Sequence, residues 1–264
     1  MNDEEKYLFD LNGYLVLPNV LSPQEIERGN EAIDHHADQM EEIGRALSGE
    51  SLALKGSSRR LDLGGMLSWD RPWCELFRDL LIHPGIKPYL EGILGEGYRL
   101  DHGPGLIAMV EGCEGGQLHG GGVERPNFSE AYFFKDGRIY TGLTVVEYLF
   151  ADEGPGDGGV AVVPGSHKSN LPCPEAMRFW DKHQEHVVEV NGHAGDAIIF
   201  TETLTHGTLP WTAKHQRRAL LYKFSPSFQA YSGGAHTVTY PDYIEDMTEE
   251  QRMVMKAPQV GKPN

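Results

Sequence analysis

The chain has 264 residues, enough to form one well-filled hydrophobic core without metal or disulfide staples. Its 39 acidic and 23 basic residues give a formal charge of −16, which disfavours nucleic acid as a partner. No apolar run approaches the roughly 20 residues that cross a bilayer, so no membrane partner is expected. The three cysteines form no CxxC pair and the first five residues are mostly acidic, so a cytoplasmic protein is predicted.

The first third of the chain is predicted to be helical. Ser22 and Pro23 are typical of a helix N-cap followed by a first-turn proline, and they predict a helix that runs to about Ile43. Apolar residues at helical spacing predict two more helices, over residues 71–82 and 86–94.

From about Tyr98 the pattern changes to short apolar or alternating segments separated by Gly, Pro and Asp. Strands are expected over residues 106–110, 140–150, 159–163, 197–200 and 218–224. This spacing predicts a mainly β protein with helices, in which a double-stranded β-helix (a cupin-like jelly roll) forms the core of a single domain. The core would span about 98–231, supported by a helical layer over 1–97. The tail, 232–264, would either close the site with a helix or form a loosely attached extension.

Four motifs follow one another in the predicted β region. They are GGQLHGGG at 115–122, GGVAVVPGSHK at 158–168, GDAIIFTETLTHG at 195–207 and RRALLY at 217–222. Three of them carry a histidine: His119, His167 and His206. His167 lies in the turn PGSHK and is expected to be structural, so His119 and His206 are the candidate ligands. Iron(II) for oxygen chemistry is typically held by two imidazoles and one carboxylate, with the remaining positions open.

This ordered set, from about Tyr7 to Tyr231, resembles the phytanoyl-CoA dioxygenase family of non-haem iron(II), 2-oxoglutarate-dependent oxygenases. The resemblance implies iron(II), 2-oxoglutarate and O₂ as cofactor and cosubstrates, with His119 and His206 as iron ligands. It also implies that Arg217 holds the distal carboxylate of 2-oxoglutarate, with help from Thr208. Arg218 takes this role if the register is off by one residue.

The sequence departs from the family pattern at Gly121. Two positions after the first histidine the family has Asp or Glu, whereas here the position has no side chain. We favour the hypothesis that chloride or bromide binds beside Gly121, which makes it a catalytic position of a halogenase, because the glycine triplet leaves room for an ion. In a second hypothesis a water or a remote acid completes the site and the enzyme hydroxylates; the candidate acids are Glu124, Glu147 and Glu202. A third is a non-catalytic protein that binds a metal or a small molecule.

The substrate is predicted to be a small polar molecule. Lys55, Arg59 and Arg60 form a basic segment in an acidic chain and would bind a carboxylate or phosphate, for example of a nucleotide, although a solvated loop explains them equally well. The three consecutive aromatic residues at 132–134 either line a substrate pocket or cap the barrel. The sequence leaves the oligomeric state open.

Overall fold

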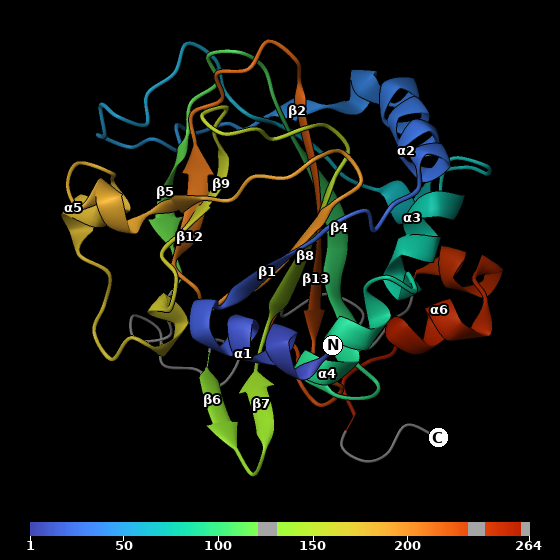
Figure 1. The fold of residues 1–264 in the computed structure, drawn as a ribbon. Coiled ribbons are helices and arrows are strands. Elements are labelled where there is room, and N and C mark those ends of the chain that lie inside the picture. Colours follow the sequence, from blue (N-terminus) through green and yellow to red (C-terminus); the bar gives the residue numbers. More distant parts are fainter. Residues whose placement is uncertain (121–130, 232–240, 260–264) are drawn as a thin grey trace.

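The computed structural model describes residues 1–120, 131–231 and 241–259, and two antiparallel sheets face each other at its centre (Figure 1). The larger sheet has the strand order β1 (Tyr14–Leu17), β11 (Ala197–Thr201), β8 (Thr144–Leu149), β13 (Arg217–Ser225), β4 (Arg99–Met109), β3 (Leu61–Leu63) and β2 (Glu41–Glu42). The smaller sheet has the order β10 (Val188–Glu189), β9 (Gly159–Val162), β12 (His206–Leu209) and β5 (Gly116–His119). The strands β6 (Tyr132–Lys135) and β7 (Arg138–Thr141) form a separate hairpin. The predicted class, a mainly β jelly roll with supporting helices, is confirmed.

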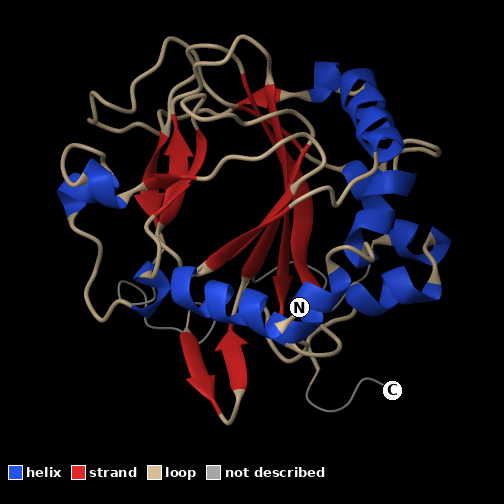
Figure 2. Ribbon diagram, viewed as in Figure 1, coloured by secondary structure: helices blue, strands red, loops and turns tan. Residues whose placement is uncertain are grey.

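Most of the helices cover one face of the large sheet (Figure 2). The helices are α1 (Asp3–Asn12), α2 (Pro23–His35), α3 (Glu75–Asp79), α4 (Lys87–Leu94), α5 (Glu175–Arg178) and α6 (Glu249–Val254). Helices α2, α3, α4 and α6 lie on the side of the large sheet away from the small sheet, and α5 lies beyond the small sheet (Figure 1). Within the described residues, no helix is long and apolar enough to cross a membrane.

The helix predicted from Pro23 begins as expected but ends early. The Ser22 side chain accepts a hydrogen bond from the Glu25 backbone N–H, and the Glu25 carboxylate accepts one from the Ser22 N–H. The helix stops at His35 instead of Ile43. Beyond it the backbone of β2 pairs with β3, because this polar segment has little apolar surface to bury as a helix.

The first 97 residues are therefore not purely helical. Strand β1 pairs with β11 at one edge of the large sheet, and β2 and β3 extend its other edge beyond β4. The sequence did not predict these three strands, because segments of two to four residues are too short to establish an alternating pattern.

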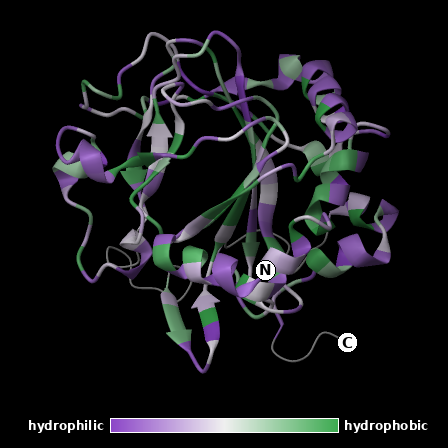
Figure 3. Ribbon diagram, in the orientation of Figure 1, coloured by the Kyte–Doolittle hydropathy of each residue, from purple (hydrophilic) through white to green (hydrophobic). Residues whose placement is uncertain are grey.

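Alternation along β8 divides its side chains between two cores. Val146 and Tyr148 pack with the helices, whereas Val145 and Leu149 face the small sheet inside the barrel. In Figure 3 the strands mix hydrophobic and hydrophilic colours, and the helices likewise carry both. Glu147 lies between Val145 and Leu149 on the barrel face, so its charged side chain is placed among apolar ones.

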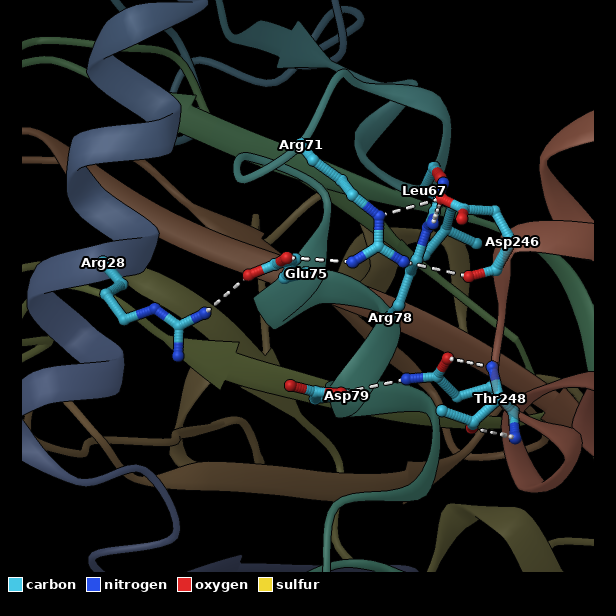
Figure 4. A network of polar contacts seen from close by, with 9 residues as sticks. Arg28, Leu67, Arg71, Glu75, Arg78, Asp79, Asp246 and Thr248 are labelled. Carbon is cyan, nitrogen blue, oxygen red and sulfur yellow. Dashed lines mark hydrogen bonds and ion pairs between the residues drawn. The ribbon is translucent and has the colours of Figure 1, made fainter.

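The described part of the tail packs on the outer helices. Asp246 accepts hydrogen bonds from the Arg71 Nε at 3.0 Å and from the Arg78 guanidinium at 2.9 Å (Figure 4). Gln251 of α6 donates to Asp79 of α3 at 2.9 Å. Helix α6 and the small sheet lie on opposite sides of the large sheet (Figure 1). This part of the tail is thus attached by several polar contacts, and its helix does not close over the two sequence-predicted iron ligands.

Candidate metal centre

The two histidines predicted as iron ligands lie side by side. His119 is the last residue of β5 and His206 the first of β12, and the two are direct partners in the antiparallel register. Their ring centroids are 4.2 Å apart. The Nδ1 of His119 lies 2.8 Å from the His206 carbonyl oxygen, and the Nδ1 of His206 lies 2.7 Å from the Leu204 carbonyl oxygen. With Nδ1–H donating to a carbonyl, the Nε2 of each ring is available to a metal.

A carboxylate completes this group. Glu202 lies in the turn between β11 and β12, and its Oε1 is 3.8 Å from the Nε2 of His206. One ligand atom from each of His119, His206 and Glu202 lies within 4.8 Å of the other two. Two imidazoles and one carboxylate are the donor set that iron(II) takes in oxygen-using enzymes, so the residues fit this metal.

The electrostatics suit a divalent cation. Burial, together with the neighbouring His119, lowers the pKa of His206 to about 4, so the ring is neutral at pH 7, as a ligand must be. Burial by itself would raise the pKa of Glu202, but the surrounding His206, Lys223 and His119 outweigh it and lower that pKa, which keeps the carboxylate ionised. Lys223 Nζ lies 3.4 Å from the Glu202 Oε2. His206 is buried whereas His119 is exposed, so the group is open on one side.

Gly120 explains part of the glycine triplet. Its φ is +90°, and a Cβ there would lie 2.5 Å from the Leu204 carbonyl oxygen and 2.7 Å from that of Glu202. Only glycine lets the end of β5 approach the Glu202 turn this closely. Gly121 and Glu124 lie outside the described residues, so the halide site at Gly121 stays a prediction.

Arg217 points into the barrel, but it is already paired. Its guanidinium contacts the Glu147 carboxylate at 2.5 Å and the Glu153 carboxylate at 2.8 Å, and all three side chains are buried. Glu147, a candidate acid for the metal, is therefore a partner of Arg217 instead. Thr208 lies two residues after His206 on β12 and faces the barrel with it.

Arg218 cannot replace Arg217. Its guanidinium contacts Asn30 at 2.8 Å and Asp34 at 2.5 Å, both on α2, on the outer side of the large sheet. The alternative prediction, that Arg218 binds the distal carboxylate of 2-oxoglutarate, is wrong. Neighbouring residues of a strand face opposite sides of the sheet, so Arg218 points away from the barrel.

The residues at Arg217 do not fit 2-oxoglutarate as they stand. Two buried carboxylates, whose pKa values burial raises, already share the one guanidinium, so it has no unpaired positive charge for a further carboxylate. The sequence showed no signal for Glu153, which belongs to a turn motif. Lys223 was also missed, although it lies six residues after Arg217 and so on the same strand face.

The basic segment predicted to bind substrate lies elsewhere. The Ser57 N–H donates to the Gly112 carbonyl, and the Gly115 N–H donates to the Leu54 carbonyl. These contacts lie at the opposite end of β5 from His119, about 13 Å along a strand that rises about 3.3 Å per residue. Lys55, which lies in this segment, is exposed. Arg59 faces Glu42 at 3.7 Å and Arg60 binds Asp62 at 2.7 Å. The structure therefore does not bring this segment to the metal centre.

The aromatic residues at 132–134 divide between the two predicted roles. Tyr132 donates to Asp10 at 2.8 Å and packs against the ring of His167, as a structural residue does. Phe133 and Phe134 line a cleft of about 1190 Å³ between the hairpin, α1 and α4. None of the three metal-centre residues lines this cleft.

Known proteins match both the sequence motifs and the fold. Residues 119–219 match the model of the phytanoyl-CoA dioxygenase (PhyH) family. The crystal structure of HygX from Streptomyces hygroscopicus with iron bound is 20% identical and has a TM-score of 0.70, covering 94% of this chain and 99% of HygX. HygX was also solved with nickel, 2-oxoglutarate and hygromycin B bound (19% identity, TM-score 0.68, covering 87% and 89%).

SnoK is a second protein of similar fold. SnoK, a non-haem α-ketoglutarate-dependent carbocyclase from nogalamycin biosynthesis, is 17% identical with a TM-score of 0.63, covering 99% of this chain and 94% of SnoK. No curated protein matches the chain by sequence.

The jelly roll and its group of two histidines and one carboxylate define a non-haem metal oxygenase fold. Within that class, residues 119–219, which hold His119, Glu202, His206 and Arg217, are similar to the phytanoyl-CoA dioxygenase family. The resemblance drawn from the sequence motifs is confirmed.

Proposed function

We propose that the chain is an iron(II)- and 2-oxoglutarate-dependent oxygenase that oxidises a C–H bond of a small molecule. In this proposal His119, His206 and Glu202 hold the iron. The observation that carries it is the position of the Glu202 carboxylate beside two imidazoles whose Nδ1 atoms are already fixed by backbone carbonyls. Bound iron(II) supplies the activation of O₂ in this class, coupled to oxidation of the 2-oxo acid.

Each surrounding residue has a positioning role in this proposal. The two carbonyl partners hold the imidazole rings in one tautomer and orientation. Lys223 contacts one oxygen of Glu202 and leaves the other directed at His206. The exposed side of His119 leaves room for a cosubstrate and a substrate.

Oxygenation is favoured over halogenation by the same carboxylate. A halide would serve as the third, anionic ligand where the protein offers none, whereas Glu202 already supplies a negative charge beside both histidines. The substrate is proposed to be a small molecule, in line with HygX, which was solved with hygromycin B. The position of Lys55, Arg59 and Arg60 gives no support to a phosphate-bearing substrate.

The test is metal binding by Glu202→Ala, measured as anaerobic titration with iron(II) or with cobalt(II) as a spectroscopic probe. We expect one ion per wild-type chain and at least about tenfold weaker binding in the variant, because a ligand is lost. Glu185→Ala, which removes an exposed carboxylate outside the metal centre, is the control and should bind like the wild type. Equal affinity of Glu202→Ala and wild type would overturn the assignment.

Turnover in the presence of chloride separates the two reactions. Incubation with iron(II), 2-oxoglutarate and candidate substrates should give oxygenated products without the chlorine isotope pattern in the mass spectrum. Chlorinated product would instead support the halide site at Gly121.

A further inference from the structure

Exposed aromatic side chains are concentrated in one cleft. Among the described residues, six Phe, Tyr or Trp side chains are exposed, and five of them line the cleft between α1, the β6–β7 hairpin and α4 (Figure 1): Tyr7, Phe133, Phe134, Tyr140 and Phe228. The rings of Phe133 and Tyr140 stack with their centroids 4.9 Å apart and their planes 10° apart. A hollow of about 1190 Å³ lined by clustered aromatic rings is typical of a small-molecule site.

The carboxylates on the α1 side of the cleft already have cationic partners. Asp3, Lys6, Tyr7 and Asp10 line the cleft, and their spacing of three and four residues places them on one face of α1. Asp3 lies 3.3 Å from the Lys6 Nζ, and Asp10 lies 3.1 Å from the Lys168 Nζ. These pairs leave the α1 side of the cleft close to neutral.

The α4 side of the cleft carries negative charge that is not paired. Glu91 of α4 and Glu96, two residues after its end, line the cleft, and neither forms an ion pair within the described chain. Lys87 lies one turn before Glu91, but its ammonium contacts Glu250. The last turn of α4 also lines the cleft, and its carbonyl groups form the negative end of the helix dipole. The other cation among the described lining residues, Arg138, lies at the tip of the hairpin, on another wall.

The inner end of the cleft approaches the metal centre. Thr141, the last residue of β7, lines the cleft, and its Oγ1 lies 2.6 Å from the Oγ1 of Thr201. Thr201 directly precedes Glu202, whose backbone N–H donates to the Leu143 carbonyl at 2.9 Å. One pair of threonine side chains therefore separates the cleft from the residue that carries the proposed carboxylate ligand.

We propose that this cleft binds the substrate, and that the substrate is a planar aromatic molecule with a positive charge. The aromatic side chains offer flat apolar surfaces for stacking, and the faces of such rings attract cations. Glu91, Glu96 and the end of α4 favour a cation over a neutral or anionic molecule of the same shape. The role as substrate site rests on the proposed function, whereas the binding of a planar cation does not.

The first experiment compares two probes of the same shape and different charge on the metal-free, full-length chain. N-methylacridinium is a planar aromatic cation, and acridine is its neutral counterpart at pH 8. Titration followed by the fluorescence of each probe should show saturable binding of the cation, at least about tenfold tighter than that of acridine. Equal affinities, tighter binding of acridine, or no saturable binding of either probe would overturn the proposal.

Substitutions at exposed positions locate the site and test its charge. The double variant Glu91→Gln, Glu96→Gln should bind N-methylacridinium at least about fivefold more weakly and acridine as wild type does. Phe134→Ala, which removes a ring that is 63% exposed, should weaken the binding of both probes. Arg138→Gln removes a positive charge from the cleft and should bind the cation at least as tightly as wild type. Leu171→Ala, at an exposed site outside the cleft, is the control. Wild-type affinity in both the double variant and Phe134→Ala would contradict the proposal.

Proton NMR of bound N-methylacridinium tests the position of the cleft relative to the metal. The paramagnetic ion should broaden the probe signals in the cobalt(II)-loaded protein, but zinc(II) should not, and His206→Ala should lose the effect. If the cation binds without broadening in cobalt(II)-loaded wild type, the cleft is not the substrate site. If wild type binds no metal but still needs Glu91 and Glu96 to bind the probe, the proposed function is wrong. The substrate role then falls with it, and only a site for planar cations is left.

Discussion

Because Gly120 has no side chain, the end of β5 can lie close to the turn that carries Glu202. We predict that Gly120→Ala destabilises the fold by about 1–3 kcal/mol, because it combines a positive φ with a close approach to backbone oxygens. Iron(II) affinity should fall as well, since His119 is the preceding residue. Urea unfolding and metal titration measure the two effects.

Gly137 provides a matched control. Its φ is +77°, but a Cβ there would meet nothing within 4 Å. Gly137→Ala should therefore show only the smaller backbone cost and bind metal normally. Equal losses in both variants would show that the contact with the Glu202 turn is not important.

Burial of Glu147 also predicts a pH dependence of stability. The pKa of a carboxyl group rises here from 4.5 to about 7 on folding, so its contribution is fully present below pH 4.5 and is lost as the pH rises through 7. At about 1.36 kcal/mol per pH unit this loss is worth ~3 kcal/mol. Between pH 4.5 and pH 8 wild type should therefore lose up to this amount of unfolding free energy, whereas Glu147→Gln should not.

Urea unfolding at both pH values measures this loss. Glu185→Gln, at an exposed site, should follow the wild-type curve. If the free energy of unfolding of Glu147→Gln differs from that of wild type by the same amount at every pH, burial does not disfavour the ionised form of Glu147.

Among the elements, the helices stabilise the fold without forming the metal centre. Helices α2 and α6 each begin with a reciprocal cap, at Ser22 and at Thr248, and both lie on the outer face of the large sheet. We predict that Ser22→Ala and Thr248→Ala each lower the free energy of unfolding by about 1 kcal/mol. Neither should change iron(II) affinity, as measured by titration. A loss of affinity in either variant would show that these helices are coupled to the small sheet.

At the scale of the whole molecule, the metal should join parts of the chain that are distant in sequence. Its proposed ligands are His119 at the end of β5, His206 at the start of β12 and Glu202 in the turn before it, so unfolding would separate them. Iron(II) at about 100 times its dissociation constant should stabilise the fold by about 2.7 kcal/mol.

The corresponding rise in Tm is about 5–10 °C for a chain of this size. Scanning calorimetry with cobalt(II) in place of iron(II) measures it without oxidation. Magnesium, which prefers oxygen ligands, should have little effect, and His206→Ala should lose the response. An unchanged Tm in the wild type would argue against a metal shared by these residues.

The sequence by itself determined the class of fold and the pair of histidines, and it showed a resemblance to the phytanoyl-CoA dioxygenase family. Alternating apolar segments are a local property, and a motif such as GDAIIFTETLTHG carries its strand, its turn and His206 in one continuous stretch. The early end of α2 and the three short strands of the first third escaped prediction because pairing partners from elsewhere in the chain decided them.

Only the tertiary structure chose among the candidate acids. Glu147 and Glu202 were equivalent in the sequence, yet one lies beside Arg217 and the other beside His206. The pairing of the Arg217 guanidinium likewise depends on Glu147, 70 residues earlier in the chain. The reason is physical: which charges balance each other in a buried space depends on which side chains share that space, and the folding of distant strands against one another determines this.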